Sequence, residues 1–228
     1  MKNPLINFIS KYFSDHENQE NARNMAAYMK TTMPFYGIRV PERRLIIKQA
    51  IKKFSIQNHI EYWEVIHQLW NQPHREEKYA AIDIARSYPY YINLDSLLLF
   101  KQMIKEGAWW DFVDDIAIHL VGTILMKSPS AMWPILKRWS NDSCLWMRRA
   151  VIICQNKLKT KTNQKYLFHF CLQRAHERDF FIKKAIGWAL REYAKTSPRI
   201  VQKFLRENKE YFSTLSYKEA LKNLKKSS

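Results

Sequence analysis

The sequence predicts an all-α protein in which pairs of helices repeat and stack into a curved solenoid, an α-α superhelix with a basic concave face. Segments of about 10 to 18 residues with apolar side chains at helical spacing alternate with short breaks. No segment has the alternating pattern of a strand, and one helical pattern recurs along the chain at a fixed step. These three observations fix the fold class.

Prolines and short polar side chains mark where the helices should begin. Proline suits the first turn of a helix, where its missing N–H is not needed, and four prolines lie at such breaks: Pro41, Pro73, Pro129 and Pro198. Residues that can cap a helix N-terminus precede other apolar runs: Asn93, Asp95, Asp142, Ser143 and Asp179. Together these signals predict roughly a dozen helices with short connections.

The recurring pattern gives a register. Three similar helical stretches align on Ala80, Ala150 and Ala185, so the spacing is twice 35 and then 35 residues. The same step also reaches three further helical stretches: Arg44–Ile46, Asp114–Ile116 and Glu219–Leu221. A pair of helices of this length cannot bury its apolar faces alone, so about six repeats should stack, with equivalent positions forming a row on one surface.

Length and charge bound the organisation and the partner. The 228 residues are enough for one domain, which we expect to span 1–228 as a monomer. Lysine and arginine number 38 against 21 aspartates and glutamates, a net charge of +17, so nucleic acid is the expected partner. The segment Met1–Ser14 is too polar for a signal peptide or membrane anchor. We therefore expect no membrane partner and a cytoplasmic location.

Cysteine and glycine usage argues against several chemistries. The cysteines Cys144, Cys154 and Cys171 are odd in number and have no C-x-x-C spacing, which excludes a disulfide framework and a zinc site and predicts buried small side chains. The four glycines form no phosphate-binding loop. Neither a metal nor a cofactor is expected.

The register brings one set of functional side chains together. Asp114, Arg149 and Lys184 are equivalent residues of consecutive repeats and should lie side by side. Trp110 lies four residues before Asp114 and Trp188 four after Lys184, so both indoles should flank the same strip of surface. The result is an aromatic pocket that contains a carboxylate.

The helix expected between Asp179 and Lys195 supports this placement. One face carries the apolar side chains Ile182, Ala185, Ile186, Ala189 and Tyr193, and the opposite face carries Lys184, Trp188, Arg191 and Lys195. Tryptophan is more often a core residue, but an indole within a cationic stripe opposite the apolar face points to binding.

Asp114 lies on a helix, Trp109 to Met126, that is apolar nearly all round, so its carboxylate should be partly desolvated and need a partner. Arg149 is the candidate on the register. A structural ion pair between repeats is an equally acceptable reading of these two residues. Asp111, Asp115 and His119 are interpreted as caps, ion-pair partners and a structural histidine.

Other cations could contact DNA phosphates if this strip faces the duplex, although each is individually more often a solvated surface charge. They are Arg44, Lys48, Arg148, Arg191, Lys218, Lys222, Lys225 and Lys226.

Five blocks of sequence resemble the AlkD-type DNA alkylation repair glycosylases, a family of HEAT-like repeat proteins. In chain order they are Met25–Lys30, Gly37–Arg44, Trp109–Asp114, Leu145–Ala150 and Phe180–Lys195. The resemblance implies that Asp114 is the catalytic carboxylate, that Trp110 and Trp188 pack around the damaged nucleotide, and that Arg149 organises Asp114 and the DNA backbone. Tyr28, Lys184 and Lys195 complete the expected DNA-binding set.

The resemblance implies excision of positively charged N3- and N7-alkylated purines from double-stranded DNA without base flipping. Such bases leave without a general acid, and a carboxylate can stabilise the oxocarbenium-like sugar. No lysine is needed as a nucleophile, so the enzyme should be monofunctional. Two other readings stay open: a non-catalytic repeat protein that recognises damaged or branched DNA, and an adaptor that grips an acidic peptide.

Overall fold

The computed structural model describes residues 3–226, with the side chains of residues 223, 225 and 226 left out. Over this range the protein is helical and contains no strand, which confirms the all-α repeat architecture. No helix in this range is both long and apolar enough to cross a membrane. The chain forms two compact units, Met1–Ile92 and Asn93–Ser228. This division does not test the single-domain organisation expected from the length, which stays a prediction.

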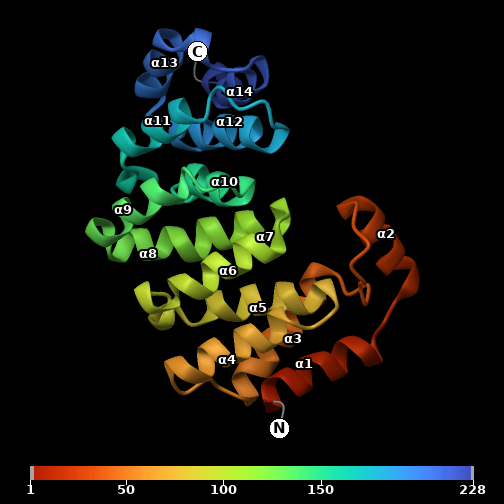
Figure 1. The fold of residues 1–228 in the computed structure, drawn as a ribbon. Coiled ribbons are helices and arrows are strands. Elements are labelled where there is room, and N and C mark those ends of the chain that lie inside the picture. The colour runs from red at the N-terminus through yellow and green to blue at the C-terminus, as the bar shows by residue number, and fades with distance from the viewer. Residues whose placement is uncertain (1–2, 227–228) are drawn as a thin grey trace. The chain divides into compact units, whose positions relative to one another are not determined.

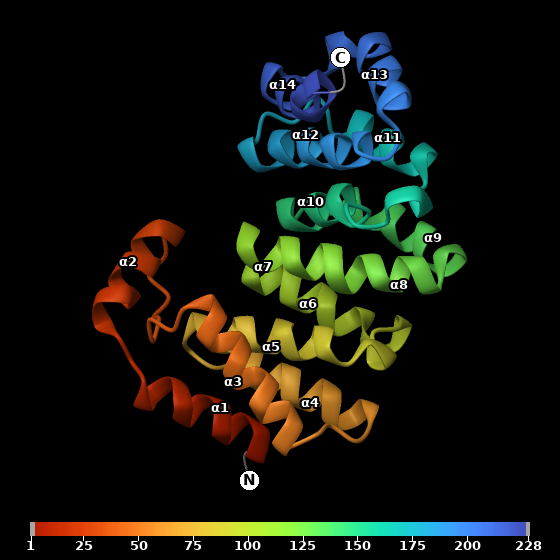
Figure 2. The ribbon, with the colours of Figure 1, turned by 180° about the vertical axis from the view of Figure 1, so that it is seen from behind.

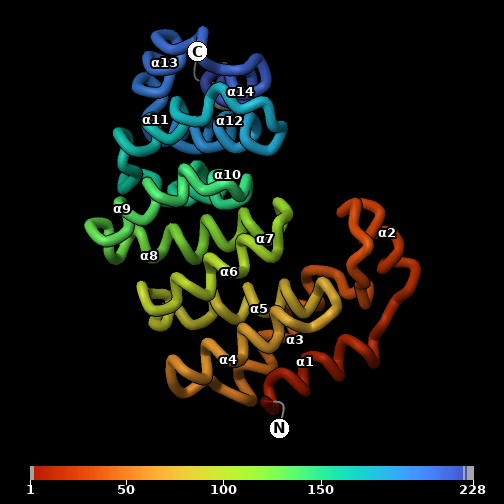
Figure 3. Tube along the Cα trace, viewed as in Figure 1, coloured from red at the N-terminus to blue at the C-terminus, as the bar shows by residue number. Residues whose placement is uncertain are grey.

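The first unit contains five α-helices (Figure 3), namely α1 (Pro4–Asp15), α2 (Gln19–Met29), α3 (Val40–Lys53), α4 (His59–Trp70) and α5 (Arg75–Ser87). A 3₁₀ turn, Pro89–Tyr91, follows α5. Helices α4 and α5 pack together, α3 packs on α5, and α1 packs on α3 and α4. The core between them is closed by large apolar side chains, among them Phe13, Tyr62 and Trp70.

A buried carboxylate holds the loop that leads into α3. Glu76 is fully buried and accepts hydrogen bonds from the backbone N–H groups of Tyr36, Gly37 and Ile38 at 3.1, 2.8 and 3.1 Å. These donors would otherwise be unsatisfied in the interior, so the contact replaces a stretch of secondary structure. The loop that positions the start of α3 is therefore anchored to α5.

The second unit contains the remaining helices. They are α6 (Leu97–Gly107), α7 (Trp110–Asp115), α8 (Gly122–Lys127), α9 (Pro129–Trp139), α10 (Leu145–Ile153), α11 (Gln164–Gln173), α12 (Phe180–Ala194), α13 (Pro198–Glu207) and α14 (Thr214–Ala220). A π-helical turn, Ile116–Val121, joins α7 to α8 without a break. Short 3₁₀ turns cover Leu94–Ser96, Lys159–Lys161, Lys209–Tyr211 and Leu221–Lys226.

Successive layers of helices stack within this second unit. Figure 1 shows α8, α10 and α12 as consecutive layers, with α9, α11 and α13 along one side, and Figure 2 shows the same order from behind. Helix α10 packs on α6, α7 and α12, and α12 packs on α13 and α14. Each layer therefore buries its apolar face against the next, as a repeat array requires.

Two glycines allow neighbouring helices of this unit to approach closely, Gly122 between α8 and α10 and Gly187 between α12 and α14. A Cβ atom added to Gly122 would lie 2.3 Å from the carbonyl oxygen of Cys154, at the end of α10. A Cβ atom added to Gly187 would lie 2.5 Å from the Cβ atom of Glu219 on α14. Glycine is needed at both positions because any side chain would push the layers apart.

Several of the sequence signals for helix starts agree with the structure. Pro129 and Pro198 begin α9 and α13, and Asp179 caps α12 by accepting from the backbone N–H groups of Phe181 and Ile182. However, Asp142 and Ser143 do not cap α10, whose N-cap residue is Cys144. Asp95 does not cap α6, whose N-cap residue is Ser96. The expectation that all three cysteines are buried is wrong for Cys144. Its side chain is only half-buried because it precedes the first turn of α10, whereas Cys154 and Cys171 are buried.

Candidate active site

A buried ion pair joins α7 to α10. The Arg149 guanidinium donates from Nε to Oδ1 of Asp114 and from Nη2 to Oδ2, both at 2.7 Å. This two-pronged geometry is the strongest arrangement available to an arginine and a carboxylate. The residues are 35 positions apart, so the pairing predicted from the repeat register is confirmed. The Asp114 side chain keeps 16% of its surface exposed, against 6% for Arg149.

Arg149 also reaches the start of α12. Its Nη1 donates to the carbonyl oxygen of Phe181 at 2.5 Å, and its guanidinium carbon lies 6.0 Å from the centre of the Phe181 ring. One guanidinium therefore links three consecutive layers, α7, α10 and α12. Since it has no freedom to turn, it fixes the orientation of the Asp114 carboxylate.

An aromatic cluster supports this ion pair. The Trp109, Trp146 and Phe181 rings have centroid separations of 5.9, 5.4 and 4.9 Å, in tilted or edge-to-face arrangements. Such geometries are favourable for aromatic rings. The indole N–H of Trp109 is buried without an acceptor in the described structure. This cluster was not predicted from the sequence, although Trp109 directly precedes Trp110 in one of the family-like blocks.

Both tryptophans of the predicted pocket lie on the second unit and keep part of their surface accessible. Trp110 is the first residue of α7, one turn before Asp114, and Trp188 lies in the middle of α12. The predicted faces of α12 are confirmed. Its apolar face is buried, whereas Lys184, Trp188 and Arg191 are half-exposed and Lys195 is exposed.

The next step of the register forms a second charge cluster. Lys184 Nζ lies 2.8 Å from Oε2 of Glu219, which is again 35 residues away and whose side chain is 4% exposed. The Arg191 guanidinium and the Lys222 ammonium also bind the Glu219 carboxylate. A single buried anion therefore holds three cations beside the Asp114–Arg149 pair.

These surroundings change the protonation of two groups. Burial raises the pKa of Asp114 above its ordinary value, while the hydrogen bonds and charge of Arg149 oppose this increase and Asp111 and Asp115 add to it. Partial burial, together with the neighbouring charges of Lys222, Arg191 and Arg149, lowers the pKa of Lys184. Perturbed pKa values of this kind cluster at functional sites, although structural ion pairs also cause them.

The cations expected to contact DNA divide into two groups. Arg148 binds the Glu177 carboxylate through Nε and Nη2 and donates to the carbonyl oxygens of Asp142 and Ser143, and Lys195 pairs with Glu192 at 2.6 Å. In contrast, Tyr28, Arg44 and Lys48 of the first unit are exposed. Arg44 and Lys48 therefore offer cations, and Tyr28 an aromatic ring, to a ligand. The side chains of Lys225 and Lys226 lie outside the described residues.

Arg44 and Lys48 line a cavity of about 480 Å³ in the first unit, between α3 and α5. Arg86 adds a third cation and Asp83 one carboxylate, which pairs with the buried Arg43 at 3.1 Å. The cavity therefore carries an excess of positive charge, which suits an anionic ligand.

No group of three or more histidine, cysteine or acidic side chains in the described structure could hold a metal ion. His119, which has been interpreted as structural, lies 3.3 Å from Asp115 and 3.0 Å from the Lys157 ammonium.

The protein is therefore an all-helical repeat protein with a carboxylate fixed between two of its layers. Comparison with known proteins gives its family. The family model of the DNA alkylation repair enzymes matches residues 9–224. The chain belongs to this family, and its role lies in the repair of alkylated DNA.

The solved structures that resemble the chain include two that match most of its length. One is described as a predicted DNA alkylation repair enzyme from Enterococcus faecalis. It has 32% sequence identity and a TM-score of 0.84, and the match covers 92% of this chain and 97% of the other. The other, smu.31 from Streptococcus mutans UA159, has 17% identity and a TM-score of 0.61, with coverage of 90% and 97%, and shows the fold alone. No curated protein matches the sequence.

Proposed function

We propose that the protein is a monofunctional DNA glycosylase that excises positively charged N3- and N7-alkylated purines, such as 3-methyladenine and 7-methylguanine, from duplex DNA in base excision repair. The observation that carries this proposal is the Asp114 carboxylate, held at both oxygens by Arg149 yet still partly exposed. A carboxylate fixed at the edge of the solvent can act on a ligand that a fully buried one cannot reach.

The chemistry asks little of the protein. An alkylated purine already carries a positive charge, so the C–N glycosidic bond breaks with both electrons leaving on the base, which departs neutral. The sugar becomes oxocarbenium-like, and Asp114 stabilises that charge from a site that is partly dry and where its orientation is fixed in advance. Water then adds to C1′ and gives its proton to the carboxylate or to solvent. The product is an abasic site.

Trp110 and Trp188 supply recognition of charge. Indole faces attract cations, at about 0.5–2 kcal/mol per contact depending on desolvation. Both rings are partly exposed on the same unit as Asp114. We propose that they contact the charged nucleotide while it stays in the duplex, on a concave HEAT-like surface, so that base flipping is not required. This contact selects for the charge that the alkyl group creates rather than for the shape of the base.

The net charge of +17 supports duplex DNA as the substrate, bound by a monomer through the phosphate backbone. The exposed side chains of Tyr28, Arg44 and Lys48 are the proposed contacts of the first unit, and Lys184, Arg191 and Lys195 those of the second. Arg148 is included with them. The second-unit cations already bind carboxylates: Arg148 binds Glu177, Lys184 and Arg191 bind Glu219, and Lys195 binds Glu192. A protein with this substrate works in the cytoplasm, on the nucleoid.

A non-catalytic DNA-binding protein is the competing function, and one observation favours it. The Lys184–Glu219 pair repeats the spacing of the Asp114–Arg149 pair while its carboxylate is almost completely buried, as in a purely structural bridge. If both pairs only joined layers, the protein would bind damaged DNA without releasing a base.

The experiment is to incubate the purified protein with duplex DNA that contains 7-methylguanine or 3-methyladenine. Mass spectrometry then measures the free base, and a denaturing gel measures strand cleavage before and after alkali. We expect release of the methylated base, with strands that break only after alkali. Salt-sensitive binding without any released base would establish the competing function, and strand breakage without alkali would contradict the monofunctional mechanism.

A further inference from the structure

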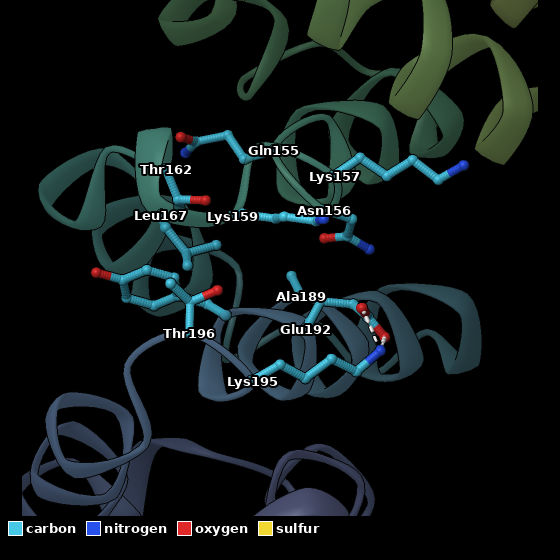
Figure 4. Close-up of a pocket in the computed structure, with 11 residues that line it drawn as sticks. Gln155, Asn156, Lys157, Lys159, Thr162, Leu167, Ala189, Glu192, Lys195 and Thr196 are labelled. Carbon is cyan, nitrogen blue, oxygen red and sulfur yellow. Dashed lines mark hydrogen bonds and ion pairs between the residues drawn. The ribbon is translucent and has the colours of Figure 1, made fainter.

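A cavity of the second unit, separate from the Asp114–Arg149 pair, has a volume of about 550 Å³. One wall is the segment after α10, including its 3₁₀ turn, and the other is the C-terminal half of α12 (Figure 4). The lining residues that matter here are Asn156, Lys157, Lys159, Leu167, Glu192 and Lys195.

The charge of this cavity is positive. Lys157, Lys159 and Lys195 line it against a single carboxylate, Glu192. Glu192 is paired with Lys195 at 2.6 Å, so it neutralises only one of the three ammonium groups. Lys157 and Lys159 are exposed at the opposite wall, and the Lys157 ammonium lies 3.0 Å from Nε2 of His119. An anionic ligand would restore the balance.

An unsatisfied donor points to the same kind of ligand. The Asn156 side-chain nitrogen is buried and has no hydrogen-bond acceptor within the described structure. A buried amide donor without a partner costs roughly 1–3 kcal/mol, so its retention calls for an acceptor that binds from outside. In Figure 4 the Asn156 amide faces the Glu192–Lys195 pair across the cavity. Phosphate oxygens are acceptors that suit both an amide N–H and an ammonium.

The backbone of this wall is held in an uncommon conformation. Lys159 has a φ of +52°, in the left-handed region that residues with a side chain rarely adopt. Such strain costs about 1 kcal/mol or more and is found mainly at binding and switch sites. Lys159 starts the 3₁₀ turn Lys159–Lys161, which turns the chain back toward α11 and keeps Lys159 on the cavity wall.

The cavity also has apolar lining, which favours a sugar–phosphate unit over a free ion. The apolar side chains of Leu167 and Ala189 line the cavity between its charged walls. A phosphodiester brings a deoxyribose that can cover this surface, whereas inorganic phosphate is hydrated on all sides and gains nothing from it.

The cavity lies directly beside the proposed active site. Glu192 and Lys195 are one and two turns beyond Trp188 on α12, on the same face. His119, which contacts Lys157, lies five residues beyond Asp114 on the continuous α7–α8 helix. The seven residues from Trp188 to Lys195 rise about 10 Å along the helix. This rise corresponds to roughly three nucleotide steps at about 3.4 Å per step of a strand.

We propose that this cavity binds a phosphodiester of the DNA backbone two to three nucleotides from the lesion, through Lys157, Lys159 and the Asn156 amide. The inference rests on the proposed function for the position of the lesion, but the phosphate contact itself requires only DNA binding. It gives the second unit a fixed register on the strand, so that the alkylated nucleotide stops beside Trp110, Trp188 and Asp114.

The first experiment measures the salt dependence of binding to an undamaged duplex, which needs no catalysis. Each lost phosphate contact reduces the slope of log K against log salt by about 0.9. We expect the double variant Lys157→Ala/Lys159→Ala to lower the slope by about 2, and the matched control Lys165→Ala, an exposed lysine of α11 outside the cavity, to leave it unchanged. An equal slope for the double variant and wild type would overturn the proposal.

The second experiment locates the contact. Single phosphates around a 7-methylguanine are replaced in turn by neutral methylphosphonates, and binding is measured for wild type and for Lys157→Ala/Lys159→Ala, which lacks the two charges that meet the phosphate. We expect a replacement two or three nucleotides from the lesion to weaken wild-type binding several-fold and to have little further effect on the double variant. If every replacement weakens both proteins equally, the cavity holds no backbone phosphate.

A third measurement separates the source of the phosphate. The thermal midpoint is followed with inorganic phosphate and with chloride at equal ionic strength. We expect no specific stabilisation by phosphate. If phosphate stabilises wild type but not Lys157→Ala/Lys159→Ala, while the salt slopes for DNA agree, the cavity is a free-anion site and the proposal is wrong. Failure of base release with the expected salt slopes would instead contradict the proposed function and leave this contact established.

Discussion

Glu76 of the first unit and Asp114 of the second are carboxylates held between helices, and the two are used differently. In the first unit Glu76 is fully buried, and three backbone N–H groups occupy it. In the second unit Asp114 is bound at both oxygens by one guanidinium but keeps 16% of its side chain exposed. Burial raises the pKa of both, opposed by backbone dipoles at Glu76 and by the Arg149 charge at Asp114.

The difference teaches how to separate a structural acid from a candidate catalyst in a repeat fold. A carboxylate whose neighbours are all backbone donors, and which solvent cannot reach, only fixes a loop. A carboxylate that is oriented by a cation while one side stays open can meet a ligand. In the second unit, α7 and α12, which Arg149 connects through Asp114 and Phe181, also carry the partly exposed indoles of Trp110 and Trp188.

The largest effect on stability should come from the structural carboxylate. Glu76→Ala leaves three buried N–H groups without an acceptor, at roughly 1–3 kcal/mol each, so the free energy of unfolding should fall by about 3–9 kcal/mol. Glu76→Gln keeps one acceptor oxygen and should lose less than half as much. Denaturant unfolding followed by circular dichroism measures both. Equal stability of Glu76→Ala and wild type would show that the loop does not depend on this contact.

A smaller loss is expected where the layers of the second unit approach most closely. The Cβ atom of Gly122→Ala would lie 2.3 Å from the backbone oxygen of Cys154, so α8 and α10 must separate, at about 1–3 kcal/mol. Because α10 carries Arg149, base release should fall as well. Ser130→Ala, an exposed position on α9, serves as the control. A thermal midpoint unchanged by Gly122→Ala would contradict the close packing.

Loss of one indole contact should have a smaller effect than either of these two changes. Trp188→Ala should reduce the rate of 7-methylguanine release about 2- to 30-fold, which corresponds to the 0.5–2 kcal/mol of a cation–indole contact. Trp63 of the first unit is also half-exposed and stacks on His67 at 4.7 Å, so Trp63→Ala is the matched control and should keep the full rate. Similar losses in both variants would show that the effect is one of general stability.

The smallest effect concerns pH. Arg149 lowers the pKa of Asp114 through its hydrogen bonds and charge. Arg149→Lys keeps the charge and loses the two-pronged contact, so the pKa of Asp114 should rise further. Because the carboxylate is the active form, the rate should be lost at a higher pH than in wild type as the solution is acidified. Single-turnover rates between about pH 4 and 8 measure this. A shift toward lower pH would contradict the role given to Arg149.

Much of the second unit could be predicted because a fixed step in the sequence becomes a fixed step between layers. The spacing of Ala150 and Ala185 was sufficient to pair Asp114 with Arg149, and the helical period of the apolar residues assigned the faces of α12. What spacing does not contain is the side-chain partner supplied by a loop or by a distant helix. The ion pair of Arg148 with Glu177 does not follow the repeat register, so the spacing could not predict it.

Two other features depended on local packing. The π-helical turn Ile116–Val121 inserts into a helix that its apolar pattern predicts to be regular, and it occurs where Gly122 lies against α10. The Trp109, Trp146 and Phe181 cluster depends on three rings from different layers, and no pairwise spacing predicts which of two adjacent tryptophans turns inward. In the first unit, the role of Glu76 required the path of a loop that has no periodicity.

The most direct test of the role of the open carboxylate is the single-turnover release of 7-methylguanine by Asp114→Asn, measured with DNA binding on the same preparation. Asp111→Asn, one turn earlier on α7, is the control. We predict a loss of about 10²- to 10³-fold for Asp114→Asn, the usual cost of one pre-oriented electrostatic group, with DNA affinity retained or increased and the control near the wild-type rate. Full release of the base by Asp114→Asn would contradict the account.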